Sequence, residues 1–182
     1  MTQPIRLSAL VASPAAGFEE PFEMLSACHE RIVRMLALLA RLREHVARHG
    51  ADEQAQQAAR DVMRYFDQAA PQHHLDEELH VFPPLLDQAD ERVAAVVRRL
   101  QQDHRDMESR WADARGVLTL LAEGRIDRLG DADQARLDAF AALYDAHLKA
   151  EEEIAYPAAQ GLLDAQALAA MGEEMMRRRG VK

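Results

Sequence analysis

The residues best suited to chemistry lie in two similar stretches of the chain, residues 73–83 (HHLDEELHVFP) and residues 147–157 (HLKAEEEIAYP). In each stretch a His is followed by Glu four and five positions later, by an aromatic residue nine positions later and by Pro ten positions later. Residues i and i+4 lie on the same face of an α-helix, one turn apart. Each stretch therefore presents an imidazole next to a carboxylate, a combination that can bind a metal ion.

Each stretch also has a His partner upstream, at nearly the same distance. His29 precedes His73 by 44 residues, and His104 precedes His147 by 43. Either upstream His alone would be more simply explained as a hydrogen-bonded core residue on an apolar helix face. Short connections make neighbouring helices antiparallel, so the repeat predicts two helical hairpins in which all four His lie at the same end and point inward. This shared level favours metal ligation.

Four imidazoles and two carboxylates in an apolar interior would be costly to bury without partners, and a metal ion removes that cost. Six N and O ligands exceed the needs of one tetrahedral zinc, and Cys28 is the only thiol. Such a ligand set favours a pair of iron ions, with manganese or zinc as alternatives. Glu77 and Glu151 would come from two different helices and are placed to bridge the ions. The spacing itself predicts a multi-ligand site and leaves the number of ions open.

The elements that must position these residues are helices, because the chain is rich in Ala, Leu, Glu, Gln and Arg and poor in aromatic and β-branched residues. The pattern predicts helices from Pro21 to near Gly50, from the cap Asp52 through a kink at Pro71 to a stop at Pro83-Pro84, from about Asp90 to Glu123, from Asp131 or Asp133 onward, and over about 165–178. We therefore predict an all-α, up-down-up-down antiparallel four-helix bundle. One domain is expected over residues 1–182, with an N-terminal arm (1–20), the bundle (21–160) and a short C-terminal helix (161–182).

The composition limits the partners of the protein. A net charge of −9 with His neutral argues against nucleic acid or an anionic membrane. The single Cys28 excludes an intrachain disulfide and fits a reducing cytosol. Residues 1–20 lack the character of a signal peptide, and no segment approaches a membrane span. We expect a cytoplasmic protein with no nucleic-acid or membrane partner, and the sequence leaves a protein partner or a homo-oligomer open.

The combination of these residues resembles the hemerythrin-like family, in particular its HHE cation-binding branch. The matching residues are His29, His73-His74 with Glu77-Glu78 and Phe82-Pro83, His104, and His147 with Glu151, and the resemblance covers roughly residues 20–160. It implies a non-haem di-iron centre with an oxo or hydroxo bridge and two bridging carboxylates. Carried over by position, it implies the metal ligands His29, His73, Glu77, His104, His147 and Glu151.

One position departs from the pattern of the oxygen-carrying hemerythrins, which place a second His four residues after the ligand of the third helix. Here that position is Glu108. Its carboxylate could ligate the metal, orient His104 or face solvent. The incomplete set of His speaks against reversible O2 carriage and favours reaction with O2, peroxide or NO at an open metal position.

The neighbours of the predicted ligands have simpler interpretations. His74 and Glu78 lie about 100° round the helix from the ligands, so we expect them behind the ligands or at the surface. The aromatic-Pro pairs at 82–83 and 156–157 are expected to cap the metal end without taking part in its chemistry. Tyr144 is expected to pack in the core, with a hydrogen bond to a bridging carboxylate as the alternative.

We therefore expect a di-iron protein that binds, senses or reacts with a small diatomic molecule (O2 or NO) or with peroxide, or that senses iron, rather than a classical enzyme. One alternative is a protein that donates iron to damaged iron–sulfur clusters or repairs them, although such relatives commonly carry an additional N-terminal domain with a Cys. Another is a structural bundle that binds a protein partner, with zinc or without metal. A ferritin-like carboxylate oxidase is disfavoured, because that family uses Glu-x-x-His and here the His comes first.

Overall fold

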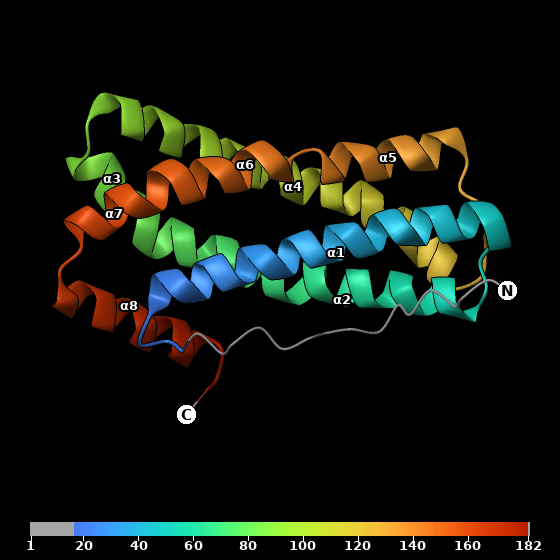
Figure 1. The fold of residues 1–182 in the computed structure, drawn as a ribbon, viewed down its shortest axis with the longest axis horizontal. Helices are drawn as coiled ribbons and strands as arrows, with labels where there is room; N and C mark the ends of the chain where they lie inside the picture. The colour runs from blue at the N-terminus through green and yellow to red at the C-terminus, as the bar shows by residue number, and fades with distance from the viewer. Residues whose placement is uncertain (1–16, 182) are drawn as a thin grey trace, which may run out of the picture.

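The computed structural model describes residues 17–181, and the regular structure in that range is helical throughout (Figure 1). The helices are α1 (Pro21–His49), α2 (Glu53–Asp76), α3 (Phe82–Gln88), α4 (Glu91–Ala122), α5 (Asp131–Ala141), α6 (Tyr144–Ala150), α7 (Tyr156–Leu162) and α8 (Ala165–Arg178). Two π-helical turns, η1 (Glu77–Val81) and η2 (Glu151–Ala155), join α2 to α3 and α6 to α7. Of the predicted N-terminal arm, only residues 17–20 fall within the described range.

The four long rods of the bundle are α1, α2, α4 and the succession α5–α7, and they run alternately up and down beside one another (Figure 1). This arrangement confirms the predicted antiparallel four-helix bundle. None of the helices in the described range is both long and apolar enough to cross a membrane.

Short polar side chains fix where several helices begin. The carboxylate of Asp52 accepts a hydrogen bond from the Ala55 backbone N–H, and that of Asp90 accepts one from the Val93 backbone N–H. α1 begins at Pro21, where the missing N–H costs nothing because the first turn of a helix leaves its N–H groups without a partner inside the helix. The predicted starts at Pro21, Asp52 and Asp90 are thus confirmed.

Two predictions about helix continuity are wrong. Pro83-Pro84 does not stop the second rod, which continues through η1 into α3 and ends at Gln88. A Pro inside a regular helix clashes with the carbonyl four residues before it, and the wider π turn that precedes Pro83 relieves this clash. The fourth rod was expected to be continuous, but a turn at residues 142–143 separates α5 from α6.

The apolar core consists of two clusters at different levels of the bundle. The larger cluster contains Leu39, Val62, Phe66, Leu118 and Phe140, and the smaller one contains Leu25, Phe82, Leu100, Tyr156 and Met175. The four predicted His ligands fall between the two clusters along every rod. They therefore form a polar layer enclosed above and below by apolar side chains, rather than the open end of the bundle.

The C-terminal helix α8 packs beside the start of α1, as Figure 1 shows. A Cβ atom at Gly172 would come within 2.0 Å of the Phe18 backbone oxygen, so the absence of a side chain permits this contact. The buried carboxylate of Asp76 accepts hydrogen bonds from Arg178 (2.7 Å) and Arg179 (3.0 Å). α8 is thereby fixed to α2, the helix that carries His73.

Candidate metal centre

The six predicted metal ligands come together in one buried group, called here the six-residue cluster. Its members are His29 on α1, His73 on α2, His104 on α4, His147 on α6, and Glu77 and Glu151 at the starts of η1 and η2. Their ligand atoms form two sets, each with all atoms within 4.8 Å of one another: His29, His73, Glu77 and Glu151, and His104, His147 and Glu151. The two Glu side chains are fully buried.

Glu77 lies between the two pairs of His. Its Oε1 is 3.4 Å from His73 Nε2 and 3.9 Å from His29 Nε2. Its Oε2 is 3.4 Å from His104 Nε2. Because the carboxylate turns one oxygen to each pair, it has the orientation of a bridging ligand.

Glu151 repeats this arrangement from the other side of the cluster. Its Oε2 is 3.2 Å from His29 Nε2, and its Oε1 is 2.9 Å from His147 Nε2 and 3.7 Å from His104 Nε2. The cluster thus contains two similar positions, each surrounded by two imidazoles and two carboxylate oxygens. We call them the His29 position (with His73) and the His104 position (with His147).

The π turns explain why the residues after each Glu also face the cluster. In η1 the Phe82 N–H donates to the Glu77 carbonyl, and in η2 the Tyr156 N–H donates to the Glu151 carbonyl. On a regular α-helix a residue five positions after Glu77 would lie about 140° round from it. The extra residue in a π turn brings Phe82 and Tyr156 back toward the face that carries the Glu. Such turns occur frequently at functional sites.

The second Glu of each stretch holds the upstream His of the opposite hairpin. Glu78 Oε1 lies 3.0 Å from His104 Nδ1, and Glu152 Oε1 lies 2.7 Å from His29 Nδ1. Each His can donate its Nδ1–H to this carboxylate, which leaves Nε2 free to face the cluster. Metal-binding His residues are commonly oriented in this way by an outer carboxylate.

These two outer carboxylates are in turn held by matching residues. The Gln101 side chain donates to Glu78 Oε2 (2.7 Å), and the Ser26 hydroxyl donates to Glu152 Oε2 (3.2 Å). Gln101 and Ser26 each lie three positions before the upstream His of their own helix. The support around the cluster is therefore as closely duplicated as the cluster itself.

The chemistry of the cluster fits a metal. Among the described residues, the buried side-chain N and O atoms without a hydrogen-bond partner all belong to His73, Glu77, His104, His147 and Glu151. A buried polar atom without a partner is destabilising, and native proteins contain few of them. Cations at the two positions would supply the missing partners to the Nε2 atoms and the carboxylate oxygens of this group.

The protein groups alone carry opposite charges. Burial lowers the pKa of His29, but the surrounding carboxylates, Glu151 and Glu152 first, outweigh it and raise that pKa to about 11. The same balance of burial against nearby carboxylates raises the pKa of His104 to about 11. Burial and the Glu77 carboxylate raise the pKa of Glu151, yet the neighbouring imidazoles bring it down to about 2. A metal ion would therefore replace protons on His29 and His104, because a ligating imidazole must be neutral.

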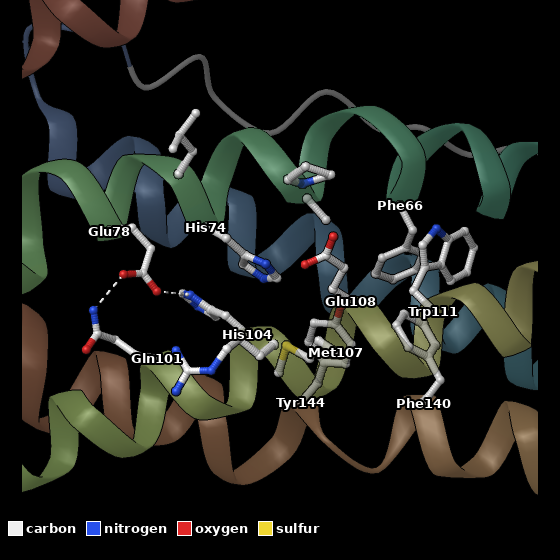
Figure 2. Close-up of a pocket in the computed structure, with 14 residues that line it drawn as sticks. Phe66, His74, Glu78, Gln101, His104, Met107, Glu108, Trp111, Phe140 and Tyr144 are labelled. Atoms are coloured by element: carbon white, nitrogen blue, oxygen red, sulfur yellow. Dashed lines mark hydrogen bonds and ion pairs between the residues drawn. The ribbon is translucent and has the colours of Figure 1, made fainter.

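A pocket of about 430 Å³ opens beside His104 (Figure 2). The His74 ring lines it and stacks on His104, with the ring centres 4.1 Å apart. The exposed Glu108 lies between His74 and Phe66 in Figure 2 and belongs to neither set of clustered ligand atoms. A pocket of this size suits a small ligand or cofactor.

A wider pocket of about 800 Å³ lies on the side of His29, Glu152 and Leu148. Tyr144 lines both pockets and packs against Phe66 and Phe140, which confirms its predicted place in the core. Small molecules can therefore approach the cluster from two sides.

Tyr156 contradicts its predicted role as a simple cap. Its buried hydroxyl donates a hydrogen bond to Glu77 Oε1 and lies 3.0 Å from His29 Nε2. Burial, followed by the charges of Glu77 and Glu151, raises the pKa of this phenol well above its usual value. Tyr156 thus belongs to the site, whereas Phe82 at the matching position offers only its ring, which stacks on His104.

Sequence reasoning also missed Glu152, Gln101 and Ser26. The spacing contained a signal for Glu152, because it stands five positions after His147 as Glu78 stands five positions after His73. No pattern marked Gln101 or Ser26, since a Gln and a Ser share no chemistry that a repeat search would detect. Asp103 was missed as well, and its carboxylate lies 3.5 Å from His147 Nδ1.

Comparison with known proteins gives two findings. A family model described as the hemerythrin HHE cation binding domain matches residues 20–159. An uncharacterised protein of Haemophilus influenzae is 32% identical over 168 residues, which cover 92% of this chain and 94% of that protein. The family match contains all six residues of the cluster and both π turns.

Proposed function

The chain belongs to the hemerythrin HHE cation-binding family, and from this premise we propose that it holds a non-haem di-iron centre that binds, senses or reacts with O2, NO or peroxide. Membership implies metal binding by the domain. The nature and number of the ions, and the small molecule, are the proposed part.

The observation that carries the proposal is the concentration of unsatisfied buried atoms in the six-residue cluster. Two carboxylates that each face both pairs of His favour two ions over one. A mixed set of imidazole and carboxylate ligands suits iron, manganese or zinc. Iron is the metal that the family implies.

The residues of the cluster and those around it would have different roles in holding the metal. The four imidazoles would hold the ions through Nε2, while Glu77 and Glu151 would hold the two ions at a fixed separation. Glu78 and Glu152 keep the Nδ1–H of His104 and His29 occupied, which orients both rings. The two apolar clusters exclude water from the layers above and below.

A pair of iron ions would supply the binding or the one-electron chemistry of a small diatomic molecule or peroxide. The pocket beside His104 gives such a molecule a route to the cluster. Glu108 lies at the wall of this pocket and outside both sets of clustered ligand atoms, which supports a role other than that of a fifth imidazole. This arrangement favours reaction or sensing over simple oxygen storage.

The first experiment is anaerobic reconstitution with Fe(II), followed by metal analysis. We expect about two iron ions per chain, one for each position described above. The double variant His73→Ala, Glu77→Ala should lose the iron. A matched control is Lys149→Ala, Glu153→Ala, which removes an exposed i, i+4 pair at the same spacing from the fourth rod and should bind iron normally. Iron content far below one ion per chain in the wild type would refute the proposal.

The second experiment records the optical spectrum of the reduced iron form after exposure to O2 and, separately, to NO. A stable new band with either gas supports binding or sensing. Rapid conversion to an oxidised spectrum supports reaction with the gas. A spectrum unchanged by both gases and by peroxide would leave only a structural role for the metal.

A further inference from the structure

The aromatic residues after the two π turns differ by one hydroxyl group, and this difference breaks the symmetry of the cluster. Phe82 and Tyr156 occupy matching positions, five residues after Glu77 and Glu151. Each ring stacks on the upstream His of the opposite hairpin. The Phe82–His104 ring centres are 5.5 Å apart, and the Tyr156–His29 ring centres are 5.3 Å apart. Only the Tyr156 ring brings a donor atom.

The Tyr156 hydroxyl reaches the atoms that would hold the metal. Its oxygen lies 3.0 Å from His29 Nε2, the nitrogen that faces the cluster because Glu152 engages Nδ1. It also donates to Glu77 Oε1, the oxygen that Glu77 turns toward His29 and His73. The side chain is 3% exposed, so no solvent competes for the hydroxyl.

Three of the distances among these atoms match those between ligands on one ion, while the Tyr156 hydroxyl lies closer to Glu77 Oε1, to which it donates its hydrogen. With bonds of about 2.1 Å, two ligand atoms at a right angle are about 3.0 Å apart, and two at a tetrahedral angle are about 3.4 Å apart. The distances from His29 Nε2 to Tyr156 Oη and to Glu151 Oε2 are 3.0 and 3.2 Å, and His73 Nε2 is 3.4 Å from Glu77 Oε1. The phenol oxygen would thus be a fifth protein atom at the His29 position, beside one atom each of His29, His73, Glu77 and Glu151.

We propose that Tyr156 is a metal ligand through its phenol oxygen at the His29 position, and that the two metal positions are therefore inequivalent. This inference rests on the proposed iron centre. On coordination the O–H bond breaks, the oxygen binds the metal, and the proton leaves to solvent; no electron is transferred. A buried phenol loses its proton to a bound cation because the cation stabilises the negative oxygen, just as a coordinated thiol is deprotonated.

The His104 position has no such fifth protein atom, because Phe82 stands where the phenol would be. Its outer coordination is left to an external molecule, which the pocket lined by His74 and His104 admits. The inference therefore assigns the small-molecule chemistry to the His104 position and a five-ligand role to the His29 position.

The experiment uses the full chain loaded with iron and then oxidised. A phenol oxygen bound to ferric iron gives an intense visible charge-transfer band and enhanced phenolate vibrations in resonance Raman spectra. The chain has three Tyr residues, and each is tested by substitution with Phe. We expect the band in the wild type, its loss in Tyr156→Phe, and its retention in Tyr65→Phe and Tyr144→Phe.

A second variant moves the phenol to the other position. In the double variant Phe82→Tyr, Tyr156→Phe, the new hydroxyl would face His104 and Glu151, so the charge-transfer band should return. Binding of azide to the ferric form of this double variant should be at least tenfold weaker than to the single variant Tyr156→Phe. If the wild-type protein holds about two iron ions but shows no phenolate vibrations, the inference is overturned, because Tyr156 then only donates a hydrogen bond to Glu77. This result would leave the proposed iron centre intact. A band that persists in Tyr156→Phe overturns the inference as well. Wild-type protein without iron overturns both proposals.

Discussion

The two halves of the metal centre have the same cage and different surroundings. The first half consists of α1, α2 and η1, and the second of α4, α6 and η2. Both halves place a His before the cluster, a His and a Glu one turn apart, a second Glu that orients the opposite upstream His, and a π turn followed by aromatic-Pro. The chain therefore contains two copies of the His and Glu residues that could hold a cation between four helices.

The two halves differ at positions that touch the cage from outside. Matching residues in the first and second halves are His74 and Leu148, Asp76 and Ala150, His80 and Ile154, Phe82 and Tyr156, and Cys28 and Asp103. His74 adds an imidazole to the wall of one pocket, and Asp76 fixes the second rod to α8. Tyr156 adds a phenol to the His29 position. From this comparison we expect metal binding to depend on the repeated residues, and selectivity among small molecules to depend on the unmatched ones.

The strongest test of the common cage is to remove one bridging carboxylate at a time. Glu77→Gln and Glu151→Gln should each release both ions, because each carboxylate faces both positions. The loss of affinity should exceed the roughly 10–100-fold cost of changing an outer partner of a ligand. Metal analysis after dialysis against a chelator measures it.

The comparison would break if Glu77→Gln lost one ion and kept the other. In that case Glu77 would serve a single position, and the two carboxylates would not be equivalent. Glu153→Gln is the control, since this exposed side chain follows directly after Glu152 and contacts no member of the cluster.

The next largest effect concerns the attachment of α8, which only the first half has. The fully buried Asp76 is paired with Arg178 and Arg179. Replacing both Arg by Ala would leave an uncompensated buried charge, so we expect a loss of about 3–5 kcal/mol in the free energy of unfolding. Urea denaturation of the metal-free protein measures this loss.

Two variants sharpen that result. Asp76→Asn should cost less, because Arg178 and Arg179 are partly exposed and can turn to water. Arg177→Ala, on the exposed side of α8, should have almost no effect. If Asp76→Asn proved as costly as the double Arg variant, the buried charge would not be the reason for the loss.

The outer carboxylates provide a smaller and more symmetrical effect. Glu78→Gln and Glu152→Gln should each weaken iron binding by roughly 10–100-fold, because the Nδ1–H of His104 or His29 loses a charged partner. Equal losses support the same orienting role for Glu78 and Glu152 in the two halves. A loss confined to Glu152→Gln would show that only the His29 position needs an oriented imidazole, and titration of the apo-protein with Fe(II) distinguishes the two outcomes.

The sequence predicted the bundle and the members of the cluster because both depend on regular periodicity. Apolar stripes and Asp caps located α1, α4 and α8, and the start of α2, to within one or two residues. The repeat of His-x-x-x-Glu with an upstream His identified six residues that the fold brings together. Residues that act through helical spacing alone are visible in a single sequence.

The rest depended on local departures from that periodicity. A rotation of 100° per residue turns Tyr156 away from the cluster, and only the π turn of η2 returns it. The corresponding turn η1 makes room for Pro83 in the second rod, where a regular helix would have stopped. The preference for a π turn comes from the contacts that it allows between helices, and these contacts are absent from the local sequence.

The smallest predicted effect is on the stability of the protein in acid, and it arises from a contact that only the first half makes with α8. The carboxylate of Glu174 on α8 lies 2.7 Å from His80, whose counterpart in the second half is the apolar Ile154. Hydrogen bonds from Arg178 and His80 lower the pKa of Glu174 to about 2. Because the folded pKa lies below the ordinary value of 4.5, the contact stabilises the protein above pH 4.5 and loses its contribution as the pH falls toward 2. Glu174→Gln should therefore flatten the decline of stability between these pH values, and urea midpoints at pH 6, 4 and 3 measure it. A variant that declines as steeply as the wild type would mean that the Glu174 carboxylate contributes nothing to the decline of stability in acid.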